Sequence, residues 1–170
     1  MQKEFSYPLK IDELGQGEQS YKLSADKDQR VWLAKILKVP AVNSFNTDIK
    51  LKFQKKKGIL EVSGKIEANL GLISVISLEE FNKDYTTDFS ILYDTNAKYE
   101  DIYQDDEDIN LDLPDIIIGG QIDLGDIAIE QLALVLEDHP RKDGEEFESV
   151  IEDNSPIRHN PFAILERLKK

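Results

Sequence analysis

The 170-residue chain contains no cysteine, which excludes disulfide bonds, thiolate nucleophiles and cysteine-ligated zinc. His139 and His159 are the only imidazoles. No apolar run approaches the roughly 18 residues that span a bilayer, and residues 1–7 lack the apolar stretch of a secretion signal. We therefore expect a cytoplasmic protein with no membrane contact, no bound metal and no cofactor.

The motifs of common enzyme active sites are also lacking. The chain has no glycine-rich phosphate loop, no Gly-x-Ser-x-Gly turn and no His-Glu-x-x-His helix. His139 precedes Pro140 at the predicted end of a helix, which favours a surface position over a general base. Asp123 and Asp126 have the spacing of an N-cap and an N3 residue, which favours helix capping over an acid pair. We predict that the protein is not an enzyme and has no small-molecule substrate.

Negative charge is abundant and unevenly distributed along the chain, whose formal net charge is −13. Residues 1–60 contain 12 Lys and Arg against 7 Asp and Glu, whereas residues 61–138 contain 3 against 20. Such a molecule repels phosphate backbones at long range, so any RNA contact would be local to the basic first third. A basic protein partner matches the bulk charge better.

Period-two alternation of apolar residues predicts most of the strands. Apolar and polar residues alternate over 49–54 and again over 60–70, on either side of a Lys-Lys-Lys-Gly turn, which is typical of an amphipathic hairpin. Further strands are expected at residues 5–11 and 88–93. Residues 72–78 have apolar side chains at both odd and even positions, which predicts a strand covered on both faces.

Two main helices are expected, over residues 27–38 and 123–137. Asp26 and Asp123 are their predicted N-caps. Asn160, followed by proline, predicts the start of a short C-terminal helix. The predicted fold is α+β: an antiparallel β-sheet or partly closed barrel packed against the two main helices, plus the C-terminal helix.

We predict a single domain over residues 1–170 that contains two acidic segments. The first, at about residues 96–112, is predicted to be a flexible loop, because such a density of like charge seldom packs. It would mimic nucleic acid to hold a basic protein, bind a divalent cation loosely, or simply increase solubility. The second, at about residues 145–158, is predicted to be an acidic linker.

Three blocks of sequence, in the same order, resemble the bacterial YceD family, the large ribosomal RNA subunit accumulation proteins. They are Gly64–Ala68 with the following Ser74-Val-Ile-Ser-Leu-Glu79, Gln121–Leu136 with the following His139–Gly144, and Asn160–Lys169. The resemblance implies a cytoplasmic, non-catalytic factor needed for accumulation of large-subunit ribosomal RNA, through its processing or early ribosome assembly. It supplies no catalytic residues.

The chain departs from the family at one motif. The family's Cys-x-x-Cys pair, the basis for regarding its members as metal-binding, is replaced here by Ser74 and Ser77. A neutral hydroxyl does not replace a thiolate on zinc. We therefore do not extend metal binding to this chain.

Two groups of cations are candidate contacts for RNA or a partner. The lysines of the predicted hairpin would contact phosphates or would form a solvated face, and alternation places Phe53 on the buried side, away from stacking. Arg141 and Lys142 would anchor a phosphate or a partner's carboxylates, or would complement the dipole of the preceding helix. The hairpin group comprises Lys50, Lys52, Lys55, Lys56 and Lys57.

These observations favour a factor that holds a ribosomal RNA precursor or a basic ribosomal or assembly protein. The alternative is an acidic protein–protein interaction module with only an indirect effect on RNA. Ultraviolet crosslinking distinguishes the two, because only direct binding leaves RNA attached to the basic third.

Overall fold

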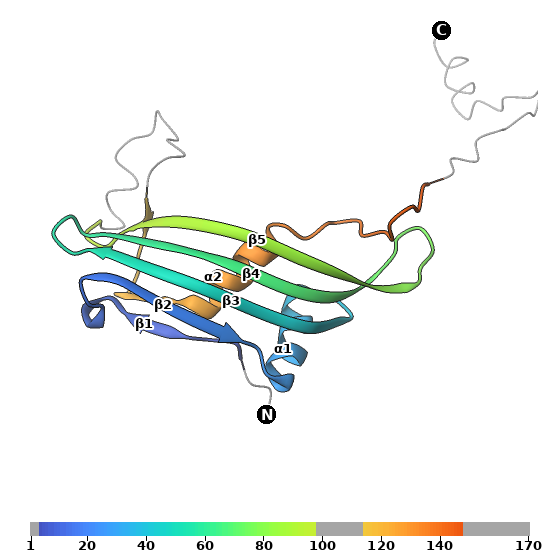
Figure 1. The fold of residues 1–170 in the computed structure, drawn as a ribbon, viewed down its shortest axis with the longest axis horizontal. Coiled ribbons are helices and arrows are strands. Elements are labelled where there is room, and N and C mark those ends of the chain that lie inside the picture. Colours follow the sequence, from blue (N-terminus) through green and yellow to red (C-terminus); the bar gives the residue numbers. More distant parts are fainter. Residues whose placement is uncertain (1–3, 98–113, 148–170) are drawn as a thin grey trace, which may run out of the picture.

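The computed structural model describes residues 4–97 and 114–147, and its centre is a long antiparallel meander (Figure 1). In the main sheet the strand order is β2-β3-β4-β5-β6, with β6 parallel to β5 and every other pair antiparallel. β1 and β7 form a separate two-stranded sheet. The elements are β1 (Pro8–Lys10), η1 (Ile11–Glu13), β2 (Gly17–Ser24), α1 (Lys27–Leu37), β3 (Ala41–Gln54), β4 (Ile59–Ile73), β5 (Glu80–Asp94), β6 (Asp115–Ile116), β7 (Gln121–Asp123) and α2 (Leu124–Ala133).

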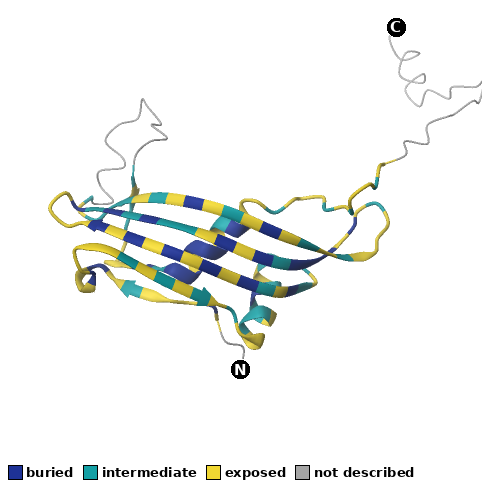
Figure 2. Cartoon of the chain, viewed as in Figure 1, coloured by how far each residue is buried: buried dark blue, intermediate teal, exposed yellow. Residues whose placement is uncertain are grey.

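The long strands form because their sequences alternate with period two. On β3 the residues Ile49, Leu51 and Phe53 are buried while the intervening side chains are exposed, as Figure 2 shows along the strands. α2 lies behind the meander in Figure 1 and packs on β5 and β1, while α1 packs on β3. The core therefore lies between one face of the sheet and these elements, and the other face is open to solvent.

Both helices begin at the predicted caps. The Asp26 side chain accepts from Gln29 N at 2.9 Å, and the Gln29 side chain accepts from Asp26 N at 3.0 Å, which completes a capping box. Asp123 accepts from the backbone N–H groups of Gly125 and Asp126. The α+β class, the hairpin and both main helices are therefore confirmed.

Of the two predicted forms of the sheet, the open, mostly antiparallel sheet is confirmed and the partly closed barrel is not formed. Three other details of the predicted fold are wrong. β1 pairs with β7 and not with the main sheet. α2 ends at Ala133, and Leu134 beyond it is 76% exposed. Residues 72–78 are not a covered strand, because β4 ends at Ile73 and a turn follows.

That turn has a local cause. The Ser74 hydroxyl accepts from Ile76 N at 3.1 Å and from Ser77 N at 3.2 Å, a serine turn that competes with strand pairing. Leu78 completes the turn with a φ of 60° and a side chain that is 77% exposed. The predicted C-terminal helix and most of the two acidic segments lie outside the described residues.

Candidate nucleic-acid interface

The lysine turn, Lys55 to Lys57, lies at the predicted tip of the β3–β4 hairpin. All three residues are exposed. The turn is closed by Lys57 N donating to Gln54 O at 2.9 Å, and Gly58 follows with a φ of 67° that favours glycine. No ion pair within the described residues joins these lysines to a carboxylate. Their side chains are therefore available to an anionic ligand.

Lys50 and Lys52 have a different environment, on the solvent face of the sheet. Lys52 lies directly opposite Glu18 on β2 and Glu61 on β4. The Lys50 Nζ is 3.7 Å from a carboxylate oxygen of Glu18. A neighbouring row across four strands alternates in sign, so this face carries balanced charge and not a positive patch. That row is Lys22, Asp48, Lys65 and Asp88.

Phe53 is 6% exposed, which confirms that it faces the core and leaves no ring for base stacking beside these lysines. Arg141 and Lys142 lie at the other end of the sheet, where the Lys142 Nζ pairs with Glu79. The two ends of β4 are about 45 Å apart at about 3.3 Å per residue. The structure therefore does not bring the two predicted cation groups together.

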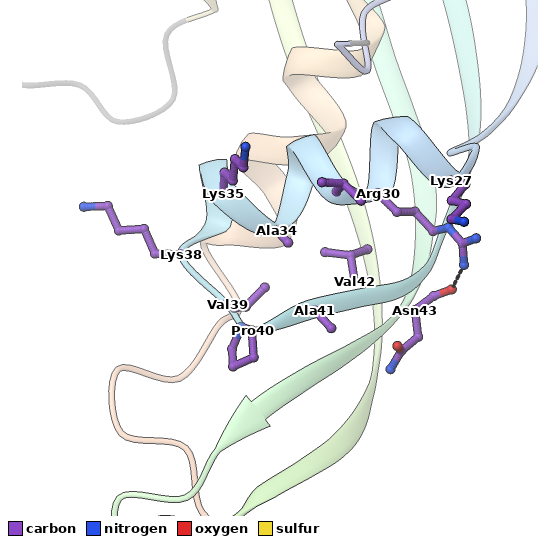
Figure 3. Close-up of a pocket in the computed structure, with 11 residues that line it drawn as sticks. Lys27, Arg30, Ala34, Lys35, Lys38, Val39, Pro40, Ala41, Val42 and Asn43 are labelled. Carbon is purple, nitrogen blue, oxygen red and sulfur yellow. Dashed lines mark hydrogen bonds between the residues drawn. The ribbon is translucent and has the colours of Figure 1, made fainter. Parts of the chain in front are cut away.

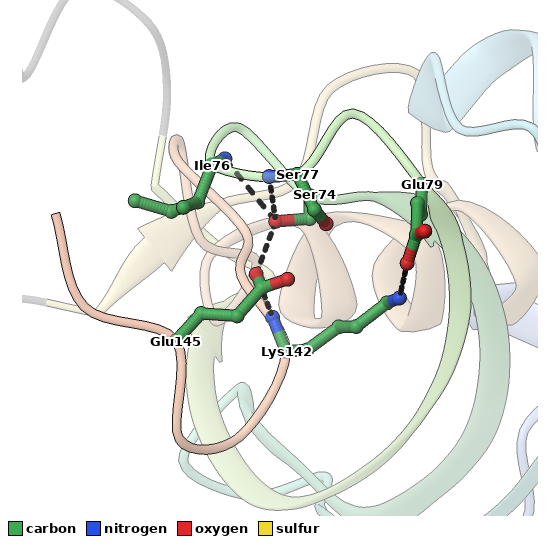
Figure 4. Close-up of polar contacts among 6 residues, drawn as sticks. All are labelled: Ser74, Ile76, Ser77, Glu79, Lys142 and Glu145. Carbon is green, nitrogen blue, oxygen red and sulfur yellow. Dashed lines mark hydrogen bonds and ion pairs between the residues drawn. The ribbon is translucent and has the colours of Figure 1, made fainter.

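Lys142 belongs to a polar cluster that joins the β4–β5 turn to the segment after α2 (Figure 4). The buried Ser74 hydroxyl donates to the Glu145 carboxylate, which also accepts from Lys142 N at 3.1 Å. Val75 N donates to Pro140 O at 2.9 Å. Hydrogen bonds from the Ser74 and Ser77 side chains, followed by the Lys142 backbone and charge, lower the pKa of Glu145. Ser74 and Ser77 thus order this turn through hydrogen bonds.

The sequence reasoning missed a third group of cations, along α1. The α1 cleft is an open hollow of about 660 Å³ between α1 and the start of β3. Figure 3 shows Lys27 and Arg30 beside Asn43 at one end and Lys38 at the other. Its lining comprises Lys27, Arg30, Val31, Ala34, Lys35, Lys38, Val39, Pro40, Ala41, Val42 and Asn43.

A β-bulge positions the arginine of this cleft. The β3–β4 register shifts between Val42 and Ser44, which leaves Asn43 out of the ladder. The Asn43 carbonyl accepts a hydrogen bond from Arg30 Nη1. Arg30 Nε is buried and has no hydrogen-bond partner in the described part of the chain. The guanidinium is therefore held at the cleft by one hydrogen bond, and its Nε–H donor has no acceptor among the described residues.

The four cations that line the α1 cleft have no carboxylate partner within 4.0 Å among residues 4–97 and 114–147. A signal for this cleft was present in the sequence. At about 100° per residue, positions 27, 30, 35 and 38 fall within an arc of about 140° on one helix face. The apolar stripe of the same helix predicted its packing on the core but did not identify the cationic face.

Within the described residues, no helix is both long enough and apolar enough to cross a bilayer. The same residues contain no group of three or more His, Asp and Glu side chains placed to hold a metal ion.

The fold and surfaces define an α+β protein with an open, meandering sheet and a cationic cleft beside its first helix. A family model described as the large ribosomal RNA subunit accumulation protein YceD matches residues 62–169. Because this match covers more than half of the chain, the chain belongs to the YceD family, which confirms the resemblance in the sequence. No curated protein matches the chain, and no solved structure matches it either. The family description relates the chain to accumulation of large-subunit ribosomal RNA.

Proposed function

We propose that the chain acts in large-subunit ribosomal RNA accumulation as a non-catalytic factor that binds precursor RNA through the α1 cleft. One observation carries the proposal: Lys27, Arg30, Lys35 and Lys38 line one cleft and have no carboxylate partner among the described residues. By contrast, Lys52 on the sheet lies between Glu18 and Glu61, and Lys50 pairs with Glu18. Cations without a carboxylate partner can neutralise RNA phosphates and release the counterions condensed on them, which favours binding.

The chemistry of the cleft predicts contact with the RNA backbone and little base specificity. Its lining includes small apolar side chains such as Val31, Ala34 and Pro40, and no aromatic ring lines it. Without a ring to stack a base, binding depends on phosphate contacts, which carry no sequence information. Four such contacts on single-stranded RNA give a log–log salt slope of about −2.8.

The net charge of −13 adds a second expectation. Long-range repulsion slows the approach of RNA, so binding should be weak and should disappear at moderate salt. Lys55, Lys56 and Lys57 remain a predicted second contact. They lie at the end of the sheet where β3 turns into β4, and they offer the same number of charges as the three lysines of the α1 cleft.

This equality provides a matched experiment. One variant carries Lys27→Glu, Lys35→Glu and Lys38→Glu, and the control carries Lys55→Glu, Lys56→Glu and Lys57→Glu. Both change the net charge equally at exposed positions. Binding of a precursor ribosomal RNA fragment is measured across a salt series, together with ultraviolet crosslinking in cells. The α1 variant should bind about tenfold or more weakly and lose about 2 from its salt slope.

Unchanged RNA binding by the α1 variant would contradict a site at this cleft. A loss confined to the control would instead assign the contact to the lysine turn. Circular dichroism of both variants shows whether α1 still forms. If the charge reversal unfolds α1, the milder variant Lys35→Ala with Lys38→Ala takes its place in the RNA-binding measurement.

The second candidate is an acidic interaction module whose effect on RNA is indirect. Its support is the concentration of 20 Asp and Glu against 3 Lys and Arg over residues 61–138. Under this alternative the wild-type chain crosslinks no RNA but retains a basic ribosomal or assembly protein in pulldowns. Deletion of residues 100–110 should then weaken that pulldown, whereas under the RNA proposal it should leave RNA crosslinking intact.

A further inference from the structure

A second hollow, of about 650 Å³, lies where the C-terminal ends of α1 and α2 meet the end of β4. We refer to it as the apolar groove. Ile129 and Ala133 of α2 and Leu136 beyond it form one side, while α1 and the following residues form the other. Its lining also includes Ile36, Leu37, Val39, Leu72, Ile73 and Tyr85.

The groove and its margin expose more apolar side chain than a solvated surface requires. Ile36 is 51% exposed and Ile73 is 44% exposed, although both lie in regular elements. Leu134 and Val135 follow the last residue of α2 and are 76% and 40% exposed. Contiguous exposed apolar surface of this kind is typical of an interaction site.

The described part of the chain after α2, up to residue 147, passes beside this groove. Pro140 lines the groove, and Glu145 is hydrogen-bonded to Ser74, the residue after groove-lining Ile73. In Figure 1 the chain after α2 runs toward the β4–β5 turn at this end of the sheet. Only 14 residues lie between Glu145 and Asn160, a tether of at most about 50 Å.

We infer that residues 160–169 of the same chain bind in the apolar groove. Their sequence places Phe162, Leu165 and Leu168 three residues apart, which predicts one apolar face on a helix that begins at Asn160 and Pro161. Burial of these three side chains against the exposed Ile36 and Ile73 would remove apolar surface of both partners from water. A short tether raises the effective concentration of the segment at the groove to the millimolar range.

Charge complementarity supports the same occupant. Glu130 and Asp138 line the groove, and no ion pair joins either of them to a cation among the described residues. The C-terminal segment ends in a basic cluster of Arg167, Lys169 and Lys170. An acidic groove margin therefore faces a basic segment, whereas RNA would be repelled from it. The groove adjoins the proposed RNA site, because Lys38, Val39 and Pro40 line both hollows, but the inference rests on the apolar side chains of α2 and the end of β4, which the RNA site does not use.

The absence of cysteine makes the test direct. Ala133→Cys in the groove is combined with Ala163→Cys in the segment, and the full-length chain is oxidised under dilute conditions. The control combines Ala163→Cys with Glu80→Cys, because Glu80 is exposed at the same end of the sheet but does not line the groove. Intramolecular disulfide yield is read from non-reducing gels and mass spectrometry.

The groove pair should form an intramolecular disulfide at least about fivefold faster than the control pair, a difference set by local effective concentration. Adding Leu168→Asp to the groove pair should reduce the rate to that of the control. Equal rates for the two pairs would overturn the inference. Disulfide-linked dimers in place of the intramolecular product would overturn it in favour of a second copy as the occupant. Neither result depends on RNA binding.

Discussion

The hydroxyl of Ser74, which has no exposed surface, donates a hydrogen bond to the carboxylate of Glu145, 71 residues later in the chain. The same hydroxyl accepts from two amides of its own turn. In this chain a serine, a glutamate and backbone amides connect the β4–β5 turn to the segment that follows α2.

Replacing this hydroxyl should therefore destabilise the fold. Ser74→Ala leaves the amides of Ile76 and Ser77 and the Glu145 carboxylate without their shared partner, and we expect a loss of about 1–3 kcal/mol in the free energy of unfolding. Urea denaturation measures the change. Ser90→Ala on the exposed face of the sheet is the control and should stay within about 0.5 kcal/mol. Equal effects of the two substitutions would contradict the assigned role of Ser74.

The same cluster predicts a pH dependence. Hydrogen bonds from Ser74 and Ser77 lower the pKa of Glu145 from its ordinary value of 4.5. A lowered pKa in the folded state stabilises the fold above the ordinary value, and this contribution is lost as the pH falls from 4.5 through the folded-state pKa. The difference in unfolding free energy between the wild type and Glu145→Gln should therefore shrink over that range. A constant difference from pH 7 to pH 2 would be inconsistent with the lowered pKa.

The carboxylate of Asp123 is predicted to stabilise more than the start of its own helix. It accepts from Tyr7 N at 2.8 Å as well as from Gly125 N at 2.8 Å, so it also ties the segment before β1 to α2. Asp123→Ala should cost about 2 kcal/mol. Asp123→Asn retains an acceptor and should cost about 0.5 kcal/mol or less. Thermal unfolding of the two variants measures the difference, and equal stability would show that the acceptor is dispensable.

For Gly125→Ala, helix propensity predicts an increase in stability whereas packing predicts a decrease. Propensity alone favours alanine within a helix by about 1 kcal/mol. In the structure a Cβ at this position would lie 2.3 Å from the backbone oxygen of Phe5. We therefore expect Gly125→Ala to destabilise by about 1–3 kcal/mol. Gly15→Ala, whose added Cβ would meet only the end of the Gln19 side chain at 3.1 Å, is the control and should be nearly neutral.

Features that depend on a few neighbouring residues could be predicted from the sequence. The caps at Asp26 and Asp123, the alternation along β3 and β4 and the exposed lysine turn each follow from local dihedral preferences or from side-chain period. The predicted strand at residues 72–78 failed because a single hydroxyl, that of Ser74, outcompeted the strand pattern of its apolar neighbours.

Features that join distant segments depended on tertiary structure. In the α1 cleft the bulge between Val42 and Ser44 presents the Asn43 carbonyl to Arg30, and the charge of Lys52 is balanced by glutamates on two neighbouring strands. Local rules do not specify which strands become neighbours, because that choice depends on how apolar surface from the whole chain is buried together. Composition and period thus determined the elements and their solvent-facing sides. Tertiary packing decided which cations have a carboxylate neighbour and which do not.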